Sequence, residues 1–220
     1  MSVRLPHCVF IHIPRTGGLW VQAVIERLGI KCQILKGDID SHLPVTELPE
    51  HWQTVPAFSF VRHPWEWVKS RWSHALELDT YGNYRHYGIH REFDECVRPS
   101  FQETLAVILS KRPGIVGETY SHMLQGVEEI RRTIDLPYAT YEMLVQYEIE
   151  TVDSDKIAEV IAATPKFNST SGMEKYREQF IDLPAGLTSK FLASEKDALK
   201  IWQAAPRIVT NHPKEEGQLP

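Results

Sequence analysis

The sequence has no long hydrophobic run and only three cysteines. No stretch approaches the roughly 20 apolar residues that span a bilayer. The first residues also lack the basic segment and apolar core of a signal peptide. Cys8, Cys32 and Cys96 are widely spaced and form neither a disulfide framework nor a metal-binding pair. We therefore expect a reducing compartment, the cytoplasm, with Cys8 and Cys32 as small core residues.

An excess of positive charge is also absent. The chain has 24 Lys and Arg residues against 29 Asp and Glu residues, for a net charge of −5. This balance argues against a general nucleic-acid binder, which needs a basic face. Any anionic ligand must therefore be held by a local cluster of cations. With 220 residues, of which 42% are hydrophobic, the chain is typical of a globular protein with one core.

Short apolar runs alternate with stretches of helical periodicity. We expect strands at 9–13, 31–35 and 57–62, helices at 20–28, 64–78, 101–110, 153–163 and 194–203, and a short strand turning into a helix at 136–144. Ser154 and Ser194 are the expected N-caps of the last two helices. Alternation of this kind predicts βαβ units, with a parallel sheet between two layers of helices.

The same pattern sets the expected domain organisation. Residues 1–204 are predicted to form a single α/β domain, and residues 205–220 a loosely held tail. The stretch 79–100, which is crowded with Tyr, His, Gly and Arg, is expected to be an irregular loop, either structural or in contact with a substrate.

The first motif is "HIPRTGG", which joins the first apolar strand to a helix. Gly17 and Gly18 let backbone N–H groups approach an anion, and the helix N-terminus adds further N–H groups. Arg15 and Thr16 contribute a cation and a hydroxyl. The G-x-x-x-x-G-K-[ST] and G-x-G-x-x-G fingerprints are both absent. The motif therefore indicates either a phosphate or sulfate cradle or only a tight turn.

A second motif, "RHPWEWVKS", repeats this plan after the strand at 57–62. Arg62 ends the strand, Pro64 starts a helix, and Ser70 follows eight residues after Arg62. The guanidinium and the hydroxyl would grip one anion from two sides. The alternative is a capped surface helix with an incidental serine.

Together, the two motifs resemble the sulfotransferases that use 3′-phosphoadenosine 5′-phosphosulfate (PAPS), in the branch that includes carbohydrate sulfotransferases. "LPYATYEML" is similar to a later strand–helix segment of that family. The resemblance implies a P-loop-like α/β fold. The positions that it implies around the donor are Arg15, Thr16, Gly17, Gly18 and Leu19 at the 5′-phosphosulfate, Trp20 beside the adenine, and Arg62 and Ser70 at the 3′-phosphate. Two residues depart from the pattern: Arg15 replaces a common lysine, and Leu19 replaces a common hydroxyl residue.

Transfer to a hydroxyl group requires a general base, for which histidine is the usual choice. We expect His42 in this role, since it follows a strand end and family members of this branch often carry His-x-Pro there. Asp38 and Asp40 lie nearby, and Asp40 is the alternative base. His42 as an ordinary loop histidine also stays open, and we expect His12 to be packed in the core.

No metal is predicted. His86 and His90 have the spacing of two ligands on one helical face, but Gly88 lies between them and no third ligand is evident. The polar segment 165–180, with Lys166, Asn168, Ser169 and Thr170, matches a late loop of the family only in general character.

Three functions stay open. The first is a PAPS-dependent sulfotransferase whose acceptor is a small molecule or glycan hydroxyl, with no nucleic-acid or membrane partner. The second is a nucleotide-dependent phosphotransferase, although the P-loop lysine and a clear magnesium-binding Asp are absent. The third is a non-catalytic module that binds a nucleotide or a protein. Two observations support this third possibility: Leu19 replaces a common hydroxyl residue, and the general base is not assigned.

Overall fold

The computed structural model describes residues 2–35, 42–77, 89–165 and 171–207. The strands are β1 (Val3–Arg4), β2 (Val9–Ile11), β3 (Gln33–Ile34), β4 (Ala57–Val61) and β5 (Glu129–Arg132). The helices are α1 (Gly18–Leu28), α2 (Pro64–Glu77), α3 (Ile89–Asp94), α4 (Phe101–Lys111), α5 (Ile115–Met123), α6 (Leu136–Glu148), α7 (Ser154–Ala163), α8 (Ser171–Lys175), α9 (Arg177–Ile181), α10 (Leu187–Ser194) and α11 (Lys196–Ala204). Short 3₁₀ turns are η1 (Val45–Glu47), η2 (Glu50–Trp52) and η3 (Thr133–Asp135).

The five strands form one mixed sheet in the order β3-β1-β2-β4-β5. β2, β4 and β5 are parallel, as predicted, but β1 pairs antiparallel with both β2 and β3. The prediction of a wholly parallel sheet was therefore wrong. The physical reason is the tight turn between β1 and β2, where the Leu5 N–H donates to the Cys8 carbonyl at 2.9 Å. So short a connection can join only antiparallel neighbours.

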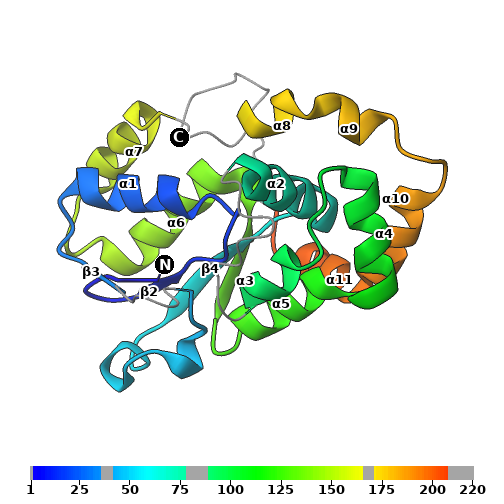
Figure 1. Ribbon diagram of the computed structural model, residues 1–220. Helices are drawn as coiled ribbons and strands as arrows, with labels where there is room; N and C mark the ends of the chain where they lie inside the picture. The colour runs from blue at the N-terminus through cyan, green and yellow to red at the C-terminus, as the bar shows by residue number, and fades with distance from the viewer. Residues whose placement is uncertain (1, 36–41, 78–88, 166–170, 208–220) are drawn as a thin grey trace.

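Helices cover both faces of the sheet, as the sequence predicted. In β4, Phe58 and Phe60 face one hydrophobic cluster, while Ala57 and Val61 face the other. This alternation follows from the two-residue period of a strand. Figure 1 shows α1, α6 and α7 on one side of the sheet, and α2, α4, α5, α10 and α11 on the other. The result is an α/β architecture with an open sheet and flanking helices.

Three local predictions were wrong. Residues 136–144 belong entirely to helix α6, whose first turn holds Pro137, and the strand that precedes it is β5. Asp153 rather than Ser154 caps α7, because its carboxylate accepts from the N–H groups of Asp155 and Lys156. Ser194 ends α10 instead of starting a helix.

Two stretches that were expected to be irregular are described only in part. The segment 79–100 contains helix α3, and the predicted tail begins with Ala205, which is buried. His86, Lys166, Asn168, Ser169, Thr170, Asp38 and Asp40 lie outside the described residues, as do residues 208–220.

Candidate functional site

Two strand–turn–helix units bring their loops to the same edge of the sheet. β2 and β4 are parallel and in register, with Ile11 opposite Ser59. Their carboxyl ends therefore lie side by side, and the loops that follow each strand meet there. The indole N–H of Trp67, on α2, donates to the Pro14 carbonyl at 2.8 Å and ties the second unit to the first.

The loop after β2 is wound tightly. The Thr16 hydroxyl donates to the Ile13 carbonyl at 2.6 Å, and the Thr16 N–H donates to the same oxygen at 3.3 Å. Arg15 has a φ of 68°, the one positive value of a non-glycine residue in the described ranges. An L-residue in this left-handed region costs roughly 1–2 kcal/mol. The surrounding contacts thus hold Arg15 in a conformation that it would not adopt freely.

Gly18 is required by the space around it, and Gly17 by its backbone conformation. A Cβ on Gly18 would lie 2.0 Å from a carbon of the His12 ring, and a Cβ on Gly17 would lie 2.5 Å from a methyl carbon of Leu136. Gly17 also has a φ of 89°. The N–H groups of Gly17, Gly18 and Leu19 donate to no acceptor in the described part of the chain. Three backbone donors are therefore without a hydrogen bond at the start of α1, where the helix dipole is positive.

Two arginines and a serine, here called the arginine site, lie beside this loop. Arg15 donates from Nε to the hydroxyl oxygen of Ser70 at 3.0 Å, and Arg62 donates from Nη1 to the Arg15 carbonyl at 3.4 Å. Ser70 is fully buried. The structure thus brings together Arg15, Arg62 and Ser70, which lie up to 55 positions apart along the chain.

Tyr120 fixes the position of Arg62. Its hydroxyl donates to the Arg62 carbonyl at 2.6 Å and accepts from the Arg62 N–H at 3.2 Å. Burial raises the pKa of the Tyr120 phenol far above its usual range, so the hydroxyl keeps its proton. Sequence reasoning missed this residue because the helix that carries it, α5, was not predicted.

Neither guanidinium of the arginine site forms an ion pair within the described ranges. Burial lowers the pKa of Arg15, and the nearby Arg62 and Arg71 cations lower it further. Burial also lowers the pKa of Arg62. Both side chains stay charged, because the pKa of a guanidinium lies above 12. Glu77 and Glu66 are close enough to offset part of these shifts, but neither carboxylate is at ion-pairing distance from the arginine it affects.

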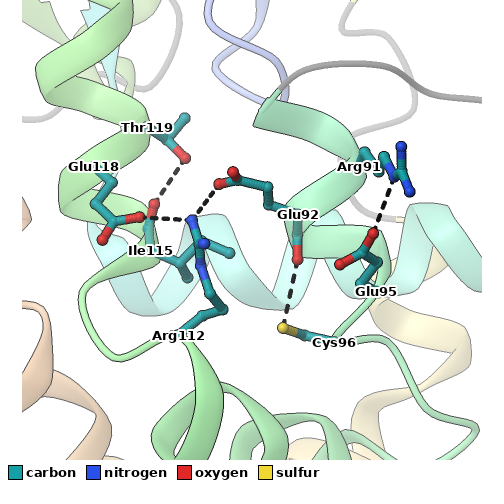
Figure 2. Close-up of polar contacts among 8 residues, drawn as sticks. All are labelled: Arg91, Glu92, Glu95, Cys96, Arg112, Ile115, Glu118 and Thr119. Carbon is teal, nitrogen blue, oxygen red and sulfur yellow. Dashed lines mark hydrogen bonds and ion pairs between the residues drawn. The ribbon is translucent and has the colours of Figure 1, made fainter.

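Arg112 shows how an arginine elsewhere in the molecule is compensated. It pairs with Glu92 of α3 and with Glu118 of α5, the latter at 2.9 Å (Figure 2). These three residues are called the Arg112 cluster. Arg91 similarly pairs with Glu95 at 3.0 Å (Figure 2). By contrast, Arg15 and Arg62 have no carboxylate at ion-pairing distance among the described residues.

His42, the predicted base, lies against His12. The two ring centroids are 5.1 Å apart and the rings meet edge to face. His12 is 9% exposed and also stacks on Phe10, as expected of a packed histidine. Because His12 also contacts Gly18, His42 lies on the same edge of the sheet as these unbonded N–H groups.

His63 follows Arg62 and forms a hydrogen bond with the first turn of α2. Its Nδ1 accepts from the Trp65 N–H at 3.3 Å, and its ring packs edge-on against Trp202. Burial lowers the pKa of His63, which favours the neutral ring that accepts this bond.

Leu19 and Trp20 have opposite environments. Leu19 is 61% exposed at the first turn of α1, whereas Trp20 is only 6% exposed and belongs to the core on the α1 face of the sheet. The Trp20 indole N–H donates to the Thr164 carbonyl at 3.3 Å. In this arrangement Trp20 contributes to the core, and little of its ring is open to a ligand.

No family model, curated protein or solved structure matches this chain. Among the described residues, no three His, Cys, Asp or Glu side chains come together as a metal site. Over the same residues, no helix combines the length and apolar character needed to cross a membrane. Function is therefore inferred from the geometry of the arginine site and the loop beside it.

Proposed function

We propose that the chain is a PAPS-dependent sulfotransferase with a P-loop-like fold, acting on a hydroxyl group of a small molecule or glycan. The observation that carries the proposal is the pair of half-buried arginines without an ion-pair partner, next to three unbonded backbone N–H groups. An anion with two separate phosphate or sulfate groups suits this set of donors. The chain motifs "HIPRTGG" and "RHPWEWVKS", which resemble those of the sulfotransferases, support the same choice.

In this proposal the donor's two ends have different protein partners. Arg62 and Ser70 hold the 3′-phosphate, since the hydroxyl proton of Ser70 has no acceptor in the described part of the chain. Arg15 and the N–H groups of Gly17, Gly18 and Leu19 hold the 5′-phosphosulfate. Arg15 bridges the two groups because it also contacts Ser70.

Sulfuryl transfer breaks the bond between sulfur and the bridging oxygen and forms one between sulfur and the acceptor oxygen. The negative charge that grows on the bridging oxygen is stabilised by Arg15 and the loop N–H groups. Arg15 acts only through its charge, because a guanidinium does not give up its proton. His42 takes the proton of the acceptor hydroxyl, with Asp40 as the alternative base.

A second function, nucleotide binding without catalysis, is favoured by one observation. Leu19 places an exposed apolar side chain at the first turn of α1, where a hydroxyl would have supplied a further donor. The two functions share the same binding site, so binding and turnover must be measured separately.

The first experiment is a thermal titration with 3′-phosphoadenosine 5′-phosphate, the expected product, and with ATP. Binding at one hundred times Kd stabilises a fold by about 2.7 kcal/mol, which raises the Tm by roughly 5–10 °C for a chain of this size. We expect a shift of this kind with the bisphosphate, a weaker one with ATP, and none with bisphosphate in Arg62→Ala. Arg112→Ala is the matched control, because it removes an arginine that already has carboxylate partners.

Turnover of labelled PAPS then separates the two functions. Binding of the bisphosphate with transfer to an acceptor hydroxyl supports the sulfotransferase. Binding without transfer across a panel of sugars and phenols favours the non-catalytic module. A well-folded protein that responds to neither nucleotide contradicts both.

A further inference from the structure

The Arg62 guanidinium ends against a methionine. Its Nη2 lies 3.7 Å from Sδ of Met173, within hydrogen-bonding distance for sulfur. Met173 belongs to α8, which packs on α2, the helix that carries Ser70. A thioether is only a weak acceptor, so the Nη2 group has a poor partner at the position where an anion's oxygen would serve it well.

Met173 is also the accessible methionine of the described residues. Met123 and Met143 are fully buried in the two hydrophobic clusters, whereas Met173 is partly exposed. Oxidation of methionine depends on access of the oxidant to sulfur. A peroxide should therefore modify Met173 well before Met123 or Met143.

We propose that Met173 is an oxidation site that controls anion binding at the arginine site. The sulfur lone pair attacks a peroxide oxygen, the O–O bond breaks, and water leaves when the oxidant is hydrogen peroxide. Sulfur is oxidised to the sulfoxide and the peroxide is reduced. The new S–O group gives the Arg62 Nη2 a strong acceptor in place of the thioether.

The consequence follows from competition for one donor. A sulfoxide oxygen bonded to Arg62 Nη2 takes the position that an incoming phosphate oxygen needs. Bonds that involve a charged donor are about twice as strong as neutral ones. We expect oxidation to weaken binding of the bisphosphate nucleotide roughly tenfold, the effect of losing one such bond. This inference rests on the proposed function, because the displaced anion is the 3′-phosphate.

The test oxidises the full-length protein with hydrogen peroxide, followed by dithiothreitol to restore the three cysteines. Peptide mass spectrometry locates the sulfoxide, and calorimetry measures the Kd of 3′-phosphoadenosine 5′-phosphate before and after. Met173→Leu is the matched control, since it keeps the volume and cannot be oxidised. We expect a tenfold loss of affinity in the wild type, none in Met173→Leu, and recovery after treatment with methionine sulfoxide reductases.

A fully oxidised Met173 with unchanged Kd would overturn the inference, as would first oxidation at Met123 or Met143. If the untreated protein does not bind the nucleotide, the proposed function fails and a second measurement decides this inference. The sulfoxide–Arg62 bond should raise the Tm of the oxidised wild type but not of oxidised Arg62→Ala. An equal Tm change in both proteins rules the bond out.

Discussion

Arginines in two regions of the molecule have opposite surroundings. Around α3, Arg71 is buried and pairs with Asp94, and Arg112 is half-exposed and pairs with Glu92 and Glu118. At the carboxyl edge of the sheet, Arg15 and Arg62 are half-buried and pair with no carboxylate of the described residues. The chain has more carboxylates than cations, so a lack of carboxylates in the protein as a whole does not explain this. The difference shows that charge pairing is decided locally, and it is the basis of the proposed anion site at this edge.

The largest expected effect concerns Asp94→Ala. It would leave the Arg71 guanidinium buried without its partner, which costs about 3–5 kcal/mol of unfolding free energy. Urea denaturation measures this loss, and Arg71→Met combined with Asp94→Leu should recover most of it. A loss below about 1 kcal/mol would mean that an unpaired buried arginine is cheap here. The lack of an ion pair at Arg15 and Arg62 would then no longer indicate that these residues bind an anion.

The pH dependence of the free energy of unfolding tests a buried acidic side chain, that of Glu195. Glu195 is fully buried and forms no ion pair among the described residues, but its Oε2 accepts from the N–H groups of Val116 and Gly117 at 3.0 and 3.1 Å. Burial raises the pKa of Glu195 to about 7 from the usual 4.5. Between these pH values the folded protein keeps a proton that the unfolded chain has lost, so stability falls as the pH rises.

We therefore expect Glu195 to lower the free energy of unfolding between about pH 4.5 and 7, by an amount on the order of 3 kcal/mol. Glu195→Gln removes the titration, so the wild-type minus variant difference should follow this slope. Urea denaturation at several pH values gives both curves. A difference that does not change with pH would show that the carboxylate is as well solvated in the fold as in the unfolded chain.

Arg15→Gly separates binding from stability. Glycine adopts the positive φ of this position without strain, which offsets the lost bond to Ser70. We expect the free energy of unfolding to change by less than about 1 kcal/mol. The Kd of the bisphosphate nucleotide should rise roughly thirtyfold, for a loss of about 2 kcal/mol. A variant that loses stability but binds normally would make Arg15 a structural residue.

The smallest effect is expected for Arg112→Ala. Its ion pairs are partly exposed, so their loss should cost less than about 1 kcal/mol. Binding of the nucleotide should not change. If binding falls as much as in Arg15→Gly, the two regions do not differ in the way that their carboxylates suggest.

Much of the site's frame was predictable because its signals are local. Val9–Ile11 and Ala57–Val61 are buried apolar strands, and each is followed by turn residues and a helix. These features place Arg15 and Arg62 at one edge of the sheet without knowledge of any tertiary contact. Gly29, in the left-handed conformation, ends α1 as predicted.

The parts of the fold and the site that were not predicted depend on contacts between residues that are distant in the sequence. β5, "EIRR", is charged along its length and becomes a strand only by pairing with β4, so no apolar pattern marks it. The sequence "LPYATYEML" has the aromatic and threonine content of a strand, but it forms the first part of helix α6, which follows the η3 turn. Which carboxylates reach which arginines is likewise decided by the packing of α2, α3 and α5.

The charged strand at the end of the sheet has a consequence for handling the protein. β5 is the outermost strand on its side, and Arg131 pairs there with Glu129 at 2.7 Å and with Glu142 at 3.8 Å. An open strand edge invites a second sheet to add to it, the usual first step of aggregation. Charged side chains on an outermost strand disfavour this kind of pairing. The opposite edge, β3, has only two residues and offers little to pair with. Both end strands of the sheet thus have a feature that disfavours the addition of a further strand.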